Sequence, residues 1–120
     1  MTCQRETGPA VVVRLATEID LTNNDRVYDR LYAAFACGAG VVVADFTTTW
    51  FCDCASLRRL LTVQQLAAAR GGQLRVIIPA GSVVHRVANL TGLDQLLDIY
   101  PSVPEATAWL APSGSSLQAS

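Results

Sequence analysis

The sequence has few of the features that mark membrane, secreted or nucleic-acid-binding proteins. Only 16% of its 120 residues are charged, and nine basic and ten acidic residues leave a net charge of −1. No cluster of basic residues is present to neutralise nucleic-acid phosphates. No apolar run approaches the roughly 18 residues of a transmembrane helix, and the N-terminus lacks the cationic and apolar regions of a signal peptide. We therefore predict a cytoplasmic protein that neither binds nucleic acid directly nor inserts into a membrane.

The residues needed for common catalytic and metal sites are also scarce. The single histidine, His85, lies among valines in a predicted short helix, so a cysteine or serine nucleophile has no evident base. The four cysteines lack the C-x-x-C spacing of zinc sites, since the one close pair is Cys52 and Cys54. Gly38-Ala39-Gly40 precedes a strand, whereas a phosphate-binding loop precedes a helix. We predict a non-enzymatic protein without cofactor or metal, whose cysteines are free thiols.

What the sequence has is a large apolar fraction in an alternating pattern of strands and helices. Apolar residues make up 51% of the chain, enough for one well-buried domain. The pattern predicts strands near residues 3–5, 10–16, 41–46, 74–78 and 96–100, with residues 17–21 as a loop. Thr22 and Ser102 each precede an acidic residue by three positions, the spacing of a helix cap, and Ser82 is a further cap residue. These signals predict three helix starts, and a fourth helix is expected over residues 56–70. This order predicts an α/β fold with a mostly parallel sheet of four to five strands, covered by about four helices. Residues 1–112 are expected to form the domain, which ends in a last helix that contains Trp109. Residues 113–120 are expected to form a flexible tail.

Two carboxylates, Asp20 and Asp53, each follow a predicted parallel strand and precede a helix. Both should therefore lie at the same edge of the sheet, where α/β proteins commonly place ligands and partners. The pair could bind Mg²⁺, complement helix dipoles, remain solvated in loops, or contact a partner protein. Trp50 and Phe51, just before Asp53, are predicted to pack in the core, with ligand contact as the alternative.

Three separated segments resemble the motifs of the STAS-domain anti-sigma-factor antagonists of bacteria. One is Phe51-Cys52-Asp53-Cys54-Ala55-Ser56-Leu57, followed by a helix, Gly71-Gly72 and a strand. It is similar to the family's Asp-Ser-Ser/Thr-Gly-Leu/Val turn at the start of a helix. The others are Thr17-Glu18-Ile19-Asp20, which resembles Gly-Glu-Leu-Asp, and Leu90-Thr91-Gly92-Leu93, which resembles Leu-Thr-Gly-Leu. The resemblance covers most of the chain.

The resemblance implies a regulator that binds an anti-sigma factor, often a serine kinase with a histidine-kinase-like ATPase fold, and so frees a sigma factor. In the family the kinase phosphorylates the second hydroxyl residue of the turn, and the added charge at the contact surface separates the complex. The partner-binding residues implied for this chain are Asp20, Asn24, Asp53, Cys54, Ala55, Ser56, Leu57, Thr91 and Gly92. The alternative is a STAS scaffold, or a small-ligand or redox-sensing module, in another signalling assembly.

The turn departs from the family pattern at the phosphorylated position. With Asp53 aligned, Cys54 occupies the position of the first serine, Ala55 that of the phosphoacceptor, and Ser56 that of the glycine. Either Ser56 accepts the phosphate instead, or the switch is lost. We favour loss, because a shift of one residue turns a side chain by about 100° around a helix, and we predict Ser56 as the N-cap or first residue of that helix. Thiol chemistry at Cys54, beside Cys52, is the redox alternative, because a helix N-terminus stabilises a thiolate.

Overall fold

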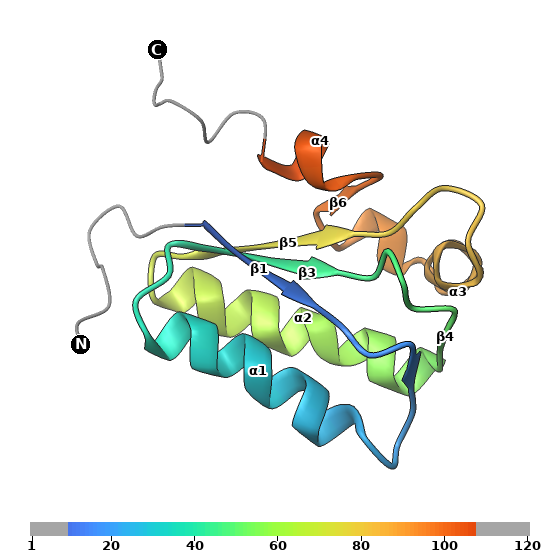
Figure 1. Ribbon diagram of the computed structural model, residues 1–120, viewed down its shortest axis with the longest axis horizontal. Coiled ribbons are helices and arrows are strands. Elements are labelled where there is room, and N and C mark those ends of the chain that lie inside the picture. The colour runs from blue at the N-terminus through green and yellow to red at the C-terminus, as the bar shows by residue number, and fades with distance from the viewer. Residues whose placement is uncertain (1–9, 108–120) are drawn as a thin grey trace.

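The computed structural model describes residues 10–107, and these form an α/β fold (Figure 1). The elements in chain order are β1 (Ala10–Arg14), β2 (Glu18–Ile19), α1 (Asn24–Ala36), β3 (Val41–Asp45), β4 (Phe51–Cys52), α2 (Cys54–Ala69), β5 (Gln73–Ile77), α3 (Val83–Thr91), the 3-10 turn η1 (Leu93–Gln95), β6 (Ile99–Tyr100) and α4 (Val103–Thr107). The predicted strand at residues 3–5, Trp109 and the tail 113–120 lie outside the described residues. No helix within residues 10–107 is long and apolar enough to cross a membrane.

The predicted parallel sheet is confirmed. Four strands pair in the order β1-β3-β5-β6, and every pair is parallel. Helices α1 and α2 lie side by side on one face of this sheet, and α4 lies on the other (Figure 1). The central strand β3 is an almost continuous buried run, because a parallel strand in this position is covered on both faces.

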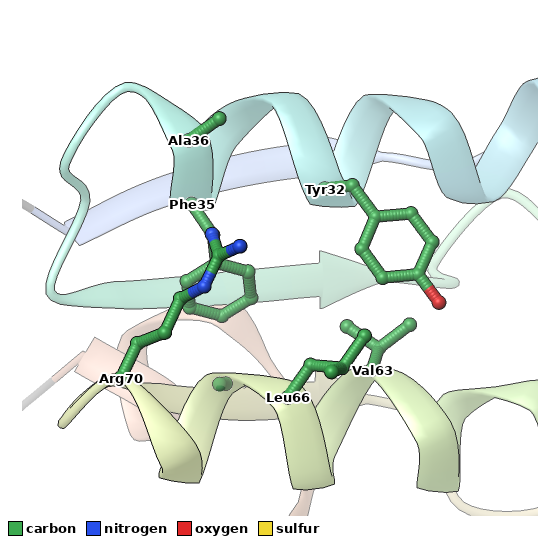
Figure 2. Close-up of a pocket in the computed structure, with 7 residues that line it drawn as sticks. Tyr32, Phe35, Ala36, Val63, Leu66 and Arg70 are labelled. Carbon is green, nitrogen blue, oxygen red and sulfur yellow. The ribbon is translucent and has the colours of Figure 1, made fainter.

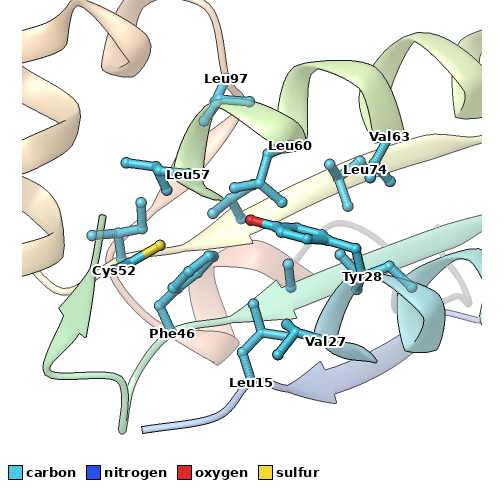
Figure 3. Close-up of a cluster of buried hydrophobic side chains, with 14 of the residues drawn as sticks. Leu15, Val27, Tyr28, Phe46, Cys52, Leu57, Leu60, Val63, Leu74 and Leu97 are labelled. Atoms are coloured by element: carbon cyan, nitrogen blue, oxygen red, sulfur yellow. The ribbon is translucent and has the colours of Figure 1, made fainter. Parts of the chain in front are cut away.

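The main core fills the space between the sheet and helices α1 and α2 (Figure 3). Val42, Ala44, Leu57 and Leu60 are fully buried in it, and so is Tyr28. The first turn of α2 contributes Leu57 to this core, so the core anchors the start of that helix. Truncating such a leucine to alanine typically costs about 2–5 kcal/mol of unfolding free energy.

A smaller cluster on the opposite face holds α4 against the sheet. Val43, Ile77 and Ala106 pack together there. Arg75 alternates with the core residues of β5, so its side chain points toward α4, and its Nη1 donates to the carbonyl oxygen of Ala106 at 2.8 Å. Burial lowers the pKa of the Arg75 guanidinium from its ordinary value.

The predicted helix caps are confirmed at two positions and wrong at a third. The Ser82 hydroxyl accepts from the backbone N–H of His85 at 3.1 Å, and Gly92 ends α3 in the left-handed conformation with φ of 80°. The Ser102 hydroxyl accepts from the backbone N–H of Glu105 at 3.4 Å. Thr22 does not cap α1, because the helix begins two residues later, after Asn23, and Asn23 makes no side-chain cap.

The prediction of a loop over residues 17–21 is also wrong in part. Glu18 and Ile19 form β2, which pairs with β4 as a separate, two-stranded parallel sheet. A two-residue strand carries no detectable period, so only its partner β4 defines it. This small sheet positions the candidate site.

Candidate functional site

The pairing of β2 with β4 brings two loops together that are more than thirty residues apart in the sequence. Ile19 is in register with Cys52, and the backbone N–H of Asp53 donates to the carbonyl oxygen of Ile19 at 3.1 Å. Asp20 and Asp53 thus follow directly after paired strands, so the prediction that both lie at one sheet edge is confirmed. The edge belongs to the small sheet, which lies beyond the end of the main sheet (Figure 1).

Asp53 is the N-cap of α2. Its Oδ1 accepts from the backbone N–H of Ser56 at 2.7 Å, and its backbone is extended, as N-cap residues usually are. The helix begins at Cys54, so Ser56 is the third helical residue. The prediction of Ser56 as N-cap or first helical residue is therefore wrong. The carboxylate one turn earlier already fills that role.

Ser56 is the centre of a buried hydrogen-bond network that joins α1 to α2. None of its surface is exposed, and its Oγ accepts from Nδ2 of Asn24 at 3.0 Å. The Tyr28 hydroxyl donates to the carbonyl oxygen of Ser56 at 2.6 Å. Burial raises the pKa of Tyr28 from its ordinary value, so this hydroxyl stays protonated and remains a donor.

Arg59 closes the network at its solvent side. Its Nη1 donates to Oδ1 of Asn24 at 2.7 Å and to Oδ1 of Asp25 at 2.6 Å. Its guanidinium also lies 5.1 Å from the centre of the Tyr28 ring, a cation–π distance. Sequence reasoning missed Tyr28 and Arg59, because their partners lie about thirty residues away and no local spacing connects them.

Asp20 organises the loop between β2 and α1. Its Oδ1 accepts from the backbone N–H of Thr22 at 2.8 Å and from the Thr22 hydroxyl at 2.5 Å. These bonds, that of the Thr22 side chain first, lower the pKa of Asp20 from its ordinary value of 3.8. Asn23 completes the loop: its Oδ1 accepts from the backbone N–H of Asp20 at 3.0 Å, and its Nδ2 donates to the Glu18 carbonyl at 2.8 Å. Thr22 thus holds a carboxylate in place, and the helix that it was predicted to cap begins only after Asn23.

Four residues next to the capped turn face solvent and are called the exposed rim below: Trp50, Phe51, Cys54 and Ala55. Trp50 is 59% exposed and Phe51 38% exposed. Their predicted place in the core is therefore wrong, because it is Cys52, between Phe51 and Asp53, that points inward. The two rings lie 6.3 Å apart, centre to centre.

The two cysteines of the turn differ in environment. Cys52 is fully buried among core side chains (Figure 3), and burial raises the pKa of its thiol to about 12. Cys54 is an exposed free thiol. A redox role for the pair is accordingly limited to Cys54 in the folded protein, because Cys52 forms neither an accessible thiol nor a thiolate near neutral pH.

The remaining residues of the implied partner-binding set lie around the turn. Leu57 is buried in the core. Thr91 is exposed at the end of α3, where its hydroxyl donates to the carbonyl of Val87 in its own helix at 2.7 Å, and Gly92 follows it. Helix α3 packs against β4, so both residues belong to the same end of the molecule as the turn (Figure 1).

The carboxylates of the site are committed to local hydrogen bonds. Asp53 caps α2 and Asp20 holds Thr22. No group of three or more metal-ligating side chains comes together in the part of the chain that the structure describes. The geometry is that of a rigid, capped turn with an exposed apolar rim, which suits contact with another protein.

Comparison with known proteins agrees with this geometry. The sequence model of the STAS domain matches residues 4–106. A Mycobacterium tuberculosis protein named as a candidate anti-anti-sigma factor, Rv2638, is 30% identical over 102 residues, which cover 82% of this chain and 68% of that protein.

Two solved structures share the fold. The anti-sigma factor antagonist SpoIIAA in its unphosphorylated form superposes with a TM-score of 0.67 at 20% identity, covering 85% of this chain and 88% of that chain. The Bacillus cell fate determinant SpoIIAA in its phosphorylated form gives a TM-score of 0.60 at 20% identity, covering 84% of this chain and 90% of that chain. At this level of identity the likeness concerns the fold alone.

Proposed function

Because the chain belongs to the STAS domain family, we propose that it is a non-enzymatic regulator that binds an anti-sigma factor and so releases a sigma factor. The family match to residues 4–106 and the relative named as an anti-anti-sigma factor support this function. The proposed partner is an anti-sigma factor with a serine-kinase-like ATPase fold.

The proposed contact surface is the exposed rim together with the neighbouring carboxylates of Asp20 and Asp53. An exposed tryptophan beside a rigid turn is suited to anchor an interface, because tryptophan buries a large area at low entropic cost. The two carboxylates add negative charge beside it, so a complementary partner surface would be basic around an apolar pocket. Ser56 and Leu57 are buried and would support the surface from beneath without touching the partner.

One observation carries the further proposal that this regulator lacks the phosphorylation switch. Ala55 is exposed at the position of the family's phosphoacceptor but has no hydroxyl. Ser56 has a hydroxyl, but it is fully buried and bonded to Asn24. A kinase would have to open the first turn of α2 to reach it. We therefore propose that the protein binds its partner with or without ATP.

Restoring and mimicking the phosphoacceptor tests both proposals. The wild type, Ala55→Ser and Ala55→Glu would be titrated by calorimetry against the purified anti-sigma factors of the source organism, with and without ATP. We expect the wild type to bind one of them equally in both conditions. Ala55→Ser should gain roughly 80 Da from one phosphoryl group when that partner is a kinase, and should then bind at least about tenfold more weakly, as Ala55→Glu should without ATP.

Ala69→Glu is the matched control, because it places the same charge on an exposed alanine at the other end of α2. It should bind like the wild type. Absence of binding to every anti-sigma factor would overturn the proposed partner. A phosphoryl group on wild-type Ser56 would overturn the loss of the switch.

A further inference from the structure

Helices α1 and α2 are hydrogen-bonded to each other near their starts and leave a cleft between their C-terminal halves (Figure 2). The cleft has a volume of about 150 Å³. Its lining residues are Tyr32, Phe35, Ala36, Val63, Leu66, Ala67 and Arg70. Twelve residues of α2 separate Cys54 from Leu66, a distance of about 18 Å along the helix axis. The cleft is thus distinct from the exposed rim.

The walls of the cleft are apolar, with a single charged group at one end. Leu66 is 47% exposed and lines the cleft, so part of its side chain is open to a ligand. A second hollow of about 200 Å³ shares Phe35 and Arg70 with the cleft and is otherwise lined by alanine and glycine residues. No acidic residue lines either space. Within residues 10–107 no carboxylate forms an ion pair with Arg70.

These dimensions and charges define what the cleft can hold. A cavity of about 150 Å³ lined by leucine and phenylalanine accommodates a benzene-sized molecule, whereas a peptide helix with its roughly 10 Å diameter does not fit. The Arg70 guanidinium complements a carboxylate. The carbonyl ends of α1 and α2 carry partial negative charge and weaken the positive field of the Arg70 guanidinium at a distance. The carboxylate therefore has to contact the guanidinium directly. We propose that the cleft binds a small aromatic carboxylate, with its ring between Tyr32 and Leu66 and its carboxylate on Arg70.

The cleft is connected to the capped turn through one face of α1. Tyr32 lies one helical turn after Tyr28, and its side chain points from α1 toward α2 in Figure 2. The Tyr28 hydroxyl in turn donates to the carbonyl oxygen of Ser56, and the Asn24 side-chain amide donates to the Ser56 hydroxyl. We infer that a ring bound beside Tyr32 shifts α1 slightly relative to α2, and that these hydrogen bonds carry the shift to the first turn of α2. Where the proposed function holds, such a ligand replaces phosphate as the signal at the exposed rim.

Titration of the full chain with benzoate, followed by nuclear magnetic resonance, tests the binding step. We expect saturable shifts of the backbone amides of Tyr32, Val63 and Ala67, with an affinity in the millimolar range. Benzyl alcohol serves as the neutral analogue and should bind more weakly than benzoate to the wild type. Absence of saturable shifts at these amides with benzoate would overturn the proposal.

Two variants with matched controls locate the ligand. Arg70→Gln should weaken benzoate about tenfold, equivalent to about 1.4 kcal/mol, and leave benzyl alcohol unchanged, while Arg58→Gln on the same helix should change neither. Ala67→Leu should fill the cleft and abolish binding of both, while Ala68→Leu, at an exposed neighbour, should bind like the wild type. Equal effects of a variant and its control would overturn the assignment to this cleft.

The same spectra test the connection to the turn. Benzoate should also shift the backbone amide of Ser56 and the side-chain amide of Asn24. Shifts confined to the cleft would overturn the connection and leave the binding site standing. Because no partner protein is present in these measurements, their failure is distinguishable from failure of the proposed function.

Discussion

Replacement of Ser56 by alanine measures how strongly the buried network holds the turn. The variant removes the Oγ that accepts from Nδ2 of Asn24 at 3.0 Å, in a place where none of Ser56 is exposed. A buried donor left without an acceptor costs about 1–3 kcal/mol of unfolding free energy. Alanine recovers up to about 0.5 kcal/mol through its higher helix propensity. We therefore expect Ser56→Ala to be less stable than the wild type by about 1–2 kcal/mol.

Urea denaturation followed by circular dichroism is the assay. For a slope of about 1.5 kcal/mol per molar urea, the midpoint should fall by about 1 M. Thr62→Ala is the control, because it removes a hydroxyl from an exposed position of the same helix and should change stability by no more than about 0.5 kcal/mol. A midpoint for Ser56→Ala that equals that of Thr62→Ala would refute the reasoning.

A double-mutant cycle separates this hydrogen bond from the other roles of the two residues. Asn24→Ala also removes one of the two acceptors of Arg59, so its own cost is not the cost of the bond to Ser56. The difference between the double variant and the sum of the single variants isolates the pair, and we expect about 1 kcal/mol of coupling. Additive single effects would mean that Ser56 and Asn24 do not interact in solution.

Three further predictions concern Trp50 and the two cysteines of the turn, Cys52 and Cys54. Trp50→Ala should weaken partner binding at least tenfold, equivalent to about 1.4 kcal/mol, while the urea midpoint stays unchanged because Trp50 is 59% exposed; Thr48→Ala, exposed in the same loop, is the binding control. Iodoacetamide near neutral pH should label Cys54 in the folded protein and leave Cys52 unlabelled; labelling of both would contradict the burial. Because burial raises the pKa of Cys52 from 9.0 to about 12, the Cys52 thiol loses its proton at a lower pH in the unfolded chain than in the folded protein. The contribution of Cys52 to the free energy of unfolding should therefore be fully present below pH 9.0 and decline as the pH rises toward 12. A urea midpoint that stays constant across that range would contradict this prediction.

The main sheet and its helices could be predicted from the sequence because each is a local pattern. The valines of β3 form a continuous apolar run, and the leucines of α2 recur at helical spacing. Ser82 and Gly92 mark the ends of α3 with residue types that suit those positions in any protein. In each case the evidence lies within one element.

The details of the site could not be predicted, because they depend on contacts between distant segments. Residues 18–19 become a strand only because β4 lies beside them. Thr22 has the spacing of a helix cap, yet its hydroxyl donates to Asp20, which the preceding strand holds within reach. Trp50 has the apolar character of a core residue, but the direction of β4 sends Cys52 inward instead. A local motif thus identifies residues that are able to form a hydrogen bond, but contacts between distant segments decide which partner each residue bonds.

The adjacent residues Ala55 and Ser56 show how helix geometry separates two requirements of a phosphorylation switch. A phosphoacceptor needs a hydroxyl and needs to face solvent. Ala55 faces solvent without a hydroxyl, and Ser56 has a hydroxyl that faces the interior. About 100° of rotation around α2 lies between them, so no small adjustment of the turn exchanges their positions. Asp53 fixes that rotation by capping the helix, and Asn24 and Tyr28 fix it from α1. The serine at position 56 therefore strengthens the turn that would have to open for it to be phosphorylated.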